Sequence, residues 1–82
     1  MLQCPELRLE QPARDLAEAA RLTALAQLVA TTAPLSDVRD LAPAVRQLFP
    51  APAYEVGCGG THIWLHRADE SRRLACILDE NS

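Results

Sequence analysis

The stretch from residue 57 to residue 80 constrains the fold more than any other, because it is typical of a β-hairpin. It reads GCGGTHIWLHRADESRRLACILDE. Residues 61–67 are rich in β-branched and aromatic side chains, which favour a pleated, half-buried strand. A second apolar run, residues 72–78, follows the polar residues 68–71, which suit a tight turn. We therefore predict an antiparallel hairpin with strands at 61–67 and 72–78.

The register of this hairpin decides which side chains share a face. With Asp69 and Glu70 at the tip of the turn, Ala68 pairs with Ser71, and side chains sort by alternation. We expect the core-facing row to consist of Thr61, Ile63 and Leu65 beside Leu78, Cys76 and Leu74. The outer row then consists of His62, Trp64 and His66 beside Ile77, Ala75 and Arg73.

The rest of the chain must cover the apolar face, because a two-stranded hairpin alone is marginal in water. Residues 12–32 predict a long helix, since Ala, Leu, Glu, Gln and Arg dominate there. Apolar residues recur at helical spacing in residues 36–49, with Ser36 as a natural N-cap. Pro43 interrupts that pattern. We expect either one kinked helix or two short ones, at 36–41 and 43–49.

Two further segments bear on the size of the sheet. Residues 1–11 alternate apolar and polar side chains, which fits either a short strand or an extended arm. Residues 53–57 are suited to a third strand. We therefore expect a single small α+β domain over residues 1–82. In it, a long N-terminal helix and a kinked second helix pack on a two- or three-stranded antiparallel β-sheet that contains the C-terminal hairpin.

Composition and charge argue against several classes of protein. The net charge is −3 and all eight basic residues are arginine, without the clustered positive charge that nucleic-acid binding requires. No stretch approaches the roughly 20 apolar residues of a membrane span, and the N-terminus lacks signal-peptide features. The odd set Cys4, Cys58 and Cys76 has no disulfide-scaffold spacing. We expect a cytoplasmic bacterial protein with reduced thiols, and no membrane or nucleic-acid partner.

Four side chains are of metal-ligand type: Cys58, His62, His66 and Cys76. On a strand, however, His62 and His66 are about 13 Å apart, and the register places Cys76 on the opposite face. Cys58 with His62 as its base is a candidate nucleophile, but glycine-rich links between strands are usually turns or bulges. We expect no enzyme, no cofactor, no metal and no catalytic residue. A small zinc- or thiol-dependent protein is the third hypothesis.

A DNA-binding regulator of the winged-helix type is the second hypothesis. A long helix, two shorter helices and a hairpin are its ordered parts, and Arg39 and Arg46 would then lie on the reading face. The recognition helix, residues 43–49, has only about two turns. Asp37 and Asp40 lie close by and would repel phosphates.

The outer row of the hairpin supplies the leading hypothesis. Trp and Arg are the residue types most enriched at binding hot spots, and Trp64 sits between two histidines. The competing interpretation is that Trp64 is buried beneath the N-terminal arm. We expect a noncatalytic protein-interaction module, of the accessory, regulatory or inhibitor kind that phages and mobile elements encode. It would bind a larger protein, or itself as a homodimer. The expected contact residues are His62, Trp64, His66, Arg73 and Ile77.

Overall fold

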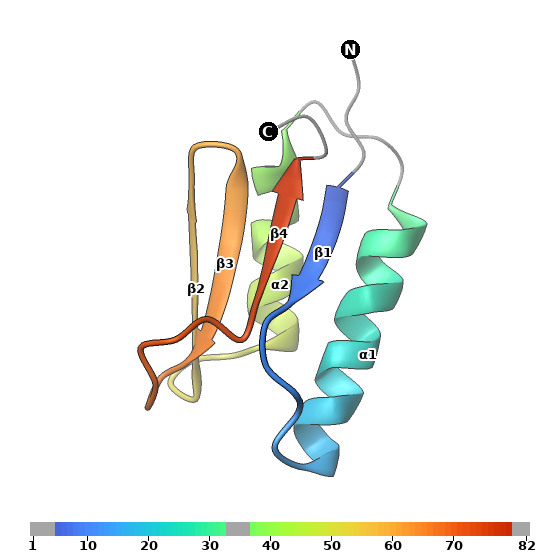
Figure 1. Cartoon of the computed structure of the whole chain (residues 1–82). Coiled ribbons are helices and arrows are strands. Elements are labelled where there is room, and N and C mark those ends of the chain that lie inside the picture. The colour runs from blue at the N-terminus through green and yellow to red at the C-terminus, as the bar shows by residue number, and fades with distance from the viewer. Residues whose placement is uncertain (1–4, 33–36, 80–82) are drawn as a thin grey trace.

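The computed structural model describes residues 5–32 and 37–79, and it shows helices packed on a four-stranded sheet (Figure 1). All strand pairs are antiparallel, in the order β1-β4-β3-β2. The predicted α+β class is confirmed, with one strand more than the two or three expected. The elements are β1 (Pro5–Leu9), α1 (Leu16–Thr31), the 3₁₀ turn η1 (Val38–Leu41), α2 (Ala42–Leu48), β2 (Tyr54–Gly59), β3 (His62–Arg67) and β4 (Ala75–Asp79).

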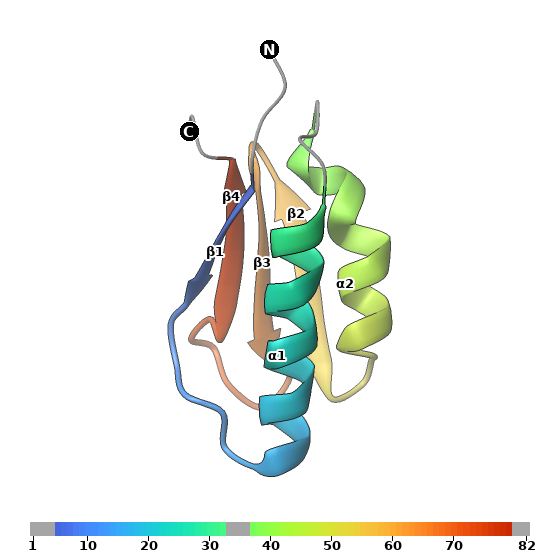
Figure 2. The same ribbon diagram turned by 90° about the vertical axis from the view of Figure 1, so that its right-hand side faces the viewer.

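Both helices lie on the same face of the sheet, and the opposite face carries no helix among the described residues (Figure 2). The hydrophobic core fills the space between these two layers. Its largest fully buried side chains come from both layers, with Leu25, Val45 and Phe49 on the helical side and Ile63, Leu65 and Ile77 on the sheet. The described residues therefore form two layers, and none of their helices covers the second face of the sheet.

The fourth strand comes from the N-terminal segment, for which the sequence left strand and arm open. β1 pairs with β4 and places Leu7 opposite Ile77. Leu7 packs against the core cluster from the sheet side. Residues 5–9 therefore extend the sheet and do not lie across its open face.

Polar caps set where α1 and η1 begin. The Asp15 side chain accepts a hydrogen bond from the Glu18 N–H at 2.8 Å, so α1 begins at Leu16 and not at residue 12. The second helical segment consists of two short helices, η1 and α2, which was one of the two predicted alternatives. Asp37 caps η1, and Pro43 lies in the first turn of α2, where a missing N–H costs nothing. Ser36, the predicted cap, lies outside the described residues.

The two hairpins have connections of different kinds. β2 and β3 are joined by Gly60 and Thr61, and Gly60 has a φ of 58°. That positive φ at the first central position is what a two-residue II′ turn requires. The link from β3 to β4 runs through residues 68–74 and is not the tight turn at Asp69 and Glu70 that the sequence suggested.

This longer link changes the register of the predicted hairpin. Ile63 pairs with Ile77 and Trp64 with Cys76, one residue away from the expected pairing. A shift of one residue turns every side chain of a strand to the other face. Ile77 is therefore core-facing and 2% exposed, and Cys76 lies on the open face.

A buried ion pair joins α1 to the end of β3. Arg67 and Glu18 are 4% and 1% exposed, and the Arg67 Nε donates to both carboxylate oxygens of Glu18, at 3.1 and 3.0 Å. The Tyr54 hydroxyl donates to the same carboxylate at 2.9 Å. A buried carboxylate with this many donors is stabilised as the anion. These contacts fix the helix against β2 and β3 at once.

The remaining Arg67 donors bind the chain around the ion pair. Its Nη1 donates to Gln11 Oε1 at 2.9 Å and to Glu70 Oε2 at 2.8 Å. Its Nη2 donates to the carbonyl of Pro12 at 3.0 Å. Among the described side chains, no buried nitrogen or oxygen lacks a hydrogen-bond partner. Arg67 therefore connects the segment before α1, the helix itself and the link after β3.

Removing one member of this pair should be strongly destabilising. Glu18→Gln leaves the buried Arg67 with only the partly exposed Glu70 as counter-ion, and we expect it to lower the free energy of unfolding by about 3–5 kcal/mol. The matched control is Glu70→Gln, which removes a partly exposed partner of the same arginine and should cost less than about 1 kcal/mol. Urea denaturation followed by circular dichroism measures both. Equal losses of stability in the two variants would contradict the conclusion that Glu18 is the main counter-ion of Arg67.

The ion pair should also make stability depend on pH in the acid range. Hydrogen bonds from Arg67 lower the pKa of Glu18 from 4.5 to about 2, against the opposing effect of burial. The unfolded chain binds this proton near pH 4.5, so the contribution is complete above that value and is lost as pH falls toward 2. The double variant Glu18→Met/Arg67→Met should lose stability less steeply over this range. Urea denaturation at several pH values measures this. If the free energy of unfolding depended on pH equally in the wild type and the double variant, the linkage would be refuted.

Candidate functional site

The sheet face without helices, called the outer face below, is built from alternate residues of all four strands. Its middle consists of side chains that are buried or half-buried, although none of the described helices covers them. Its two sides end in exposed charged residues. From the β1 side to the β2 side, the outer face comprises Glu6, Arg8, Cys76, Leu78, His62, Trp64, His66, Glu55, Gly57 and Gly59.

A glycine on the neighbouring strand leaves room for the Trp64 indole. Trp64 pairs with Gly57, and its indole lies directly over that residue. A Cβ atom on Gly57 would come within 2.4 Å of the indole Cε2 and 2.5 Å of Nε1. At Gly59 the same test gives 3.5 Å, an ordinary contact. The absence of a side chain at Gly57 is therefore what allows the indole to lie flat across β2.

The two histidines flank Trp64 on the same strand. The rings of His62 and Trp64 are tilted, with centroids 5.3 Å apart. His66 Nε2 lies 3.8 Å from a Glu55 carboxylate oxygen on β2, and His66 Nδ1 lies 3.2 Å from the Arg67 carbonyl oxygen. The row is thus a short aromatic strip with a carboxylate at one end.

Cys76 lies on the other side of Trp64, on β4, and is 4% exposed. Burial raises the pKa of its thiol, and a hydrogen bond to Glu10 raises it further. Glu10 also pairs with Arg73, whose Nε lies 3.2 Å from the carboxylate. The neutral thiol therefore serves as an apolar neighbour of the indole and is poorly suited to nucleophilic chemistry.

The structure brings together three of the five residues predicted to form a binding surface. His62, Trp64 and His66 share the outer face as expected. Arg73 lies in the link before β4 and not on the ladder, although its partner Glu10 brings it close to Cys76. Ile77 was placed wrongly, because the shifted register turns it into the core.

Other residues of this surface were missed. The sequence placed Cys76 and Leu78 in the core, and the shifted register places both on the outer face. Gly57 was expected only as the last residue of a possible strand, and its role in making room for the indole within β2 was not predicted. Alternating glycines in Gly57-Cys58-Gly59 were the available signal, since glycines two apart in a strand allow close approach on one face.

The residues of metal-ligand type do not converge. Cys58 pairs with Ile63 and is exposed, on the side of the sheet opposite to the two histidines and Cys76. In residues 5–32 and 37–79, no group of three or more His, Cys, Asp or Glu side chains could hold a metal ion. Cys4 lies outside the described residues.

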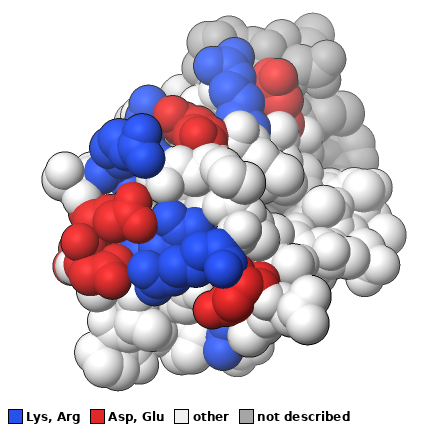
Figure 3. Space-filling view, turned by 60° about the horizontal axis from the view of Figure 1, so that its bottom comes forward, with Lys and Arg blue, Asp and Glu red and all other residues white. Residues whose placement is uncertain are grey.

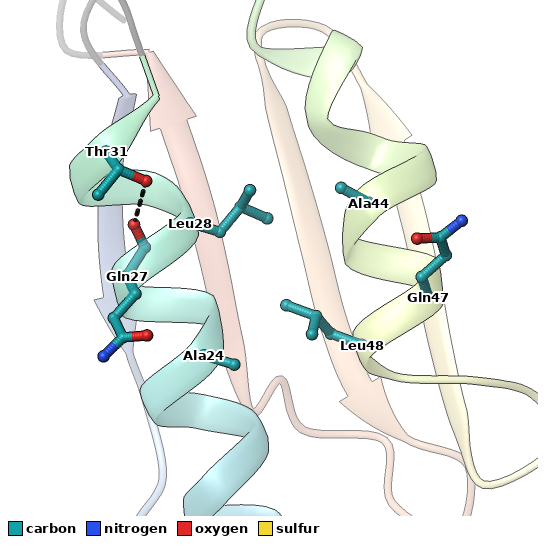
Figure 4. Close-up of a pocket in the computed structure, with 7 residues that line it drawn as sticks. All are labelled: Ala24, Gln27, Leu28, Thr31, Ala44, Gln47 and Leu48. Carbon is teal, nitrogen blue, oxygen red and sulfur yellow. Dashed lines mark hydrogen bonds between the residues drawn. The ribbon is translucent and has the colours of Figure 1, made fainter.

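A second surface feature is an open groove of about 610 Å³ between α1 and α2. In Figure 4, Leu28 and Leu48 point into the space between the two helices, whereas the side chains of Gln27 and Gln47 point away from it. Thr31 Oγ1 donates to the Gln27 carbonyl at 2.7 Å. None of the residues lining the groove is ionisable, so it offers no acid or base for catalysis.

Charged side chains gather at the end of the molecule where residues 68–74 connect β3 to β4. Seen from this end, arginines and acids lie beside one another rather than in separate patches (Figure 3). Arg14 pairs with Asp69 at 3.2 Å, and Arg67 pairs with Glu70 at 2.8 Å. The two arginines predicted for a DNA-reading surface differ in their environment. Arg39 pairs with Asp37 at 2.6 Å, and Arg46 is exposed.

Comparison with known proteins yields no relative for this chain. No protein-family model, no curated protein and no solved structure matches it. No helix among the described residues is long and apolar enough to cross a membrane.

The seat of the indole can be tested with the chain's own fluorescence, because Trp64 is its single tryptophan. We expect Gly57→Ala to push the indole off β2 and into water, with a red-shifted emission maximum and stronger quenching by acrylamide. Gly59→Ala is the matched control and should leave the spectrum unchanged, since its new Cβ makes only an ordinary contact. Unchanged emission in Gly57→Ala would show that the indole does not occupy this seat.

Proposed function

We propose that this chain is a noncatalytic protein-interaction module that binds another protein through the outer face around Trp64. One observation carries the proposal: a half-buried indole lies over a glycine on a sheet face that none of the described helices covers. An aromatic side chain that is already fixed loses little conformational freedom when a partner covers it. Such residues are typical hot spots of protein interfaces.

The arrangement of side chains supports a protein as the partner. The centre of the outer face is weakly polar, with Trp64, Cys76 and Leu78 adjacent. Its sides carry the charges of Glu6, Arg8 and Glu55. An apolar centre with a charged rim is the usual anatomy of a protein–protein interface.

Charge argues for the same class of partner. Nonspecific nucleic-acid binding needs clustered, unneutralised positive charge. Here five of the arginines lie within 4 Å of a carboxylate, namely Arg8, Arg14, Arg39, Arg67 and Arg73. The regulator and the zinc or thiol protein stay as predictions, and the observed pairing of charges favours neither. An accessory or inhibitory role is part of the proposal.

The test is affinity capture followed by direct binding with purified components. We expect one partner to be retained by the wild-type protein, lost with Trp64→Ala, and weakened at least about tenfold with Gly57→Ala, because hot-spot truncations cost about 2 kcal/mol or more. Gly59→Ala should bind as the wild type does. Circular dichroism controls for folding.

Two results would oppose the proposal. Capture that is indifferent to Trp64→Ala would place the interface elsewhere. Retention of duplex DNA with a steep dependence on salt concentration would favour the regulator.

A further inference from the structure

β2 is an edge strand of the sheet, at the end of the order β1-β4-β3-β2 (Figure 1). Like the outer face, this edge has no neighbour among the described residues. We propose that two copies of this chain associate through this edge, antiparallel and centred on Val56, to form one continuous eight-stranded sheet. The inference concerns the edge of the sheet and does not depend on the proposed function of its outer face.

The hydrogen-bonding pattern shows which main-chain groups are free. The Ala68 N–H donates to the Ala53 carbonyl at 2.9 Å, one position beyond the ladder pair Tyr54–Arg67. Main-chain groups alternate in direction along a strand, so Glu55, Gly57 and Gly59 also bond to β3. Tyr54, Val56 and Cys58 therefore direct their N–H and C=O groups away from the sheet. Outside the strand ladders, no main-chain hydrogen bond from these groups to another described residue is found.

The β2 edge also lacks the features that usually prevent strands from pairing. Protected edges carry proline, or charged side chains placed along the strand. The opposite edge, β1, has both, with Pro5 at its start and exposed Glu6 and Arg8 within it. β2 carries one charged residue, Glu55, and its second half is Gly57-Cys58-Gly59. Nothing large on β2 obstructs a neighbouring strand along this half.

Self-pairing centred on Val56 makes this strand complementary to itself. Val56 then lies opposite its own copy and Tyr54 opposite Cys58 of the other, so every outward-facing group is paired. Glu55 lies opposite Gly57, which has no side chain to obstruct it. A register shifted by one pair toward the start of β2 would place the two Glu55 carboxylates directly opposite each other, which is unfavourable.

The position of the indole adds a specific contact across this interface. Over Gly57, the indole presents its Nε1 toward β2. This N–H has no acceptor among the described residues, and Glu55 of the other copy rises from the sheet beside it. Two symmetric hydrogen bonds from indole N–H to carboxylate follow from the two-fold axis. The complementarity thus lies in both the backbone and the side chains.

The helix side of the same edge leaves room for a second copy. A hollow of about 400 Å³ lies beside β2, lined by Arg46, Phe49, Ala51, Tyr54, Glu55 and Val56. Side chains of Val56 and Cys58 from the second copy would face this side of the sheet. Pairing would therefore cover apolar surface that the monomer leaves open.

Hydrogen exchange measured by NMR tests the proposal on the unmodified protein. In the dimer, the amides of Tyr54, Val56 and Cys58 should be protected, and dilution should remove that protection. The amides of Glu55 and Gly57 bond to β3 and should stay protected at every concentration. Sedimentation over the same concentrations should show the transition from monomer to dimer.

Variants at one exposed position separate the backbone from the side chain. Cys58→Pro removes an N–H that points to the second copy and leaves the bonds to β3 intact, so it should abolish dimerisation. Cys58→Ser keeps the N–H and should dimerise normally. Glu55→Ala should weaken dimerisation about tenfold or more through loss of two charge-assisted hydrogen bonds.

Two outcomes would overturn the inference. One is a protein that stays monomeric up to about 1 mM, because the dissociation constant of the dimer would then be too high for a specific association. The other is a dimer in which the Val56 and Cys58 amides still exchange freely, because association would then use another surface. Neither outcome bears on the capture experiment, because that experiment measures the retention of a different protein.

Discussion

The buried pair of Glu18 and Arg67 is the interaction on which the rest of this structure depends. A chain of 82 residues with three aromatic side chains has little core to position a long helix on a sheet. The ion pair does this instead, because Arg67 binds α1, the segment before it and the link after β3. It also requires Arg67 to point toward the helices. Because side chains alternate along a strand, the direction of Arg67 determines which face each of the other β3 side chains is on.

The outer face follows from that alternation. With Arg67 and Leu65 turned toward the helices, His66 and Trp64 must face the other way. A sheet face without helices would leave a tryptophan fully in water, and Gly57 solves this by giving the indole a place on β2. The half-buried aromatic strip is thus the consequence of an ion pair on the opposite side of the sheet. Its fixed position does not require any covering element.

The sequence predicted the elements better than their pairing, for physical reasons. The alternation in residues 62–67 was strong enough to place Ile63 and Leu65 inside and Trp64 outside. In β4 both faces are apolar, since Ala75 and Ile77 alternate with Cys76 and Leu78, so the pattern cannot select a register. The seven-residue link after β3 decided it. Nor does any local signal distinguish Arg67 from Arg72 or Arg73, because its burial depends on Glu18, far away in the chain.

The glycines of β2 connect the two open features of the sheet. Gly57 is needed because any side chain there would displace the indole, so this position cannot carry the charged residue that commonly protects an edge strand. β1 has no such constraint and carries Pro5, Glu6 and Arg8. The asymmetry between the two edges therefore has a cause within the fold. Seating Trp64 on β2 leaves the same strand open to pairing, so the aromatic face and the unprotected edge arise from one residue.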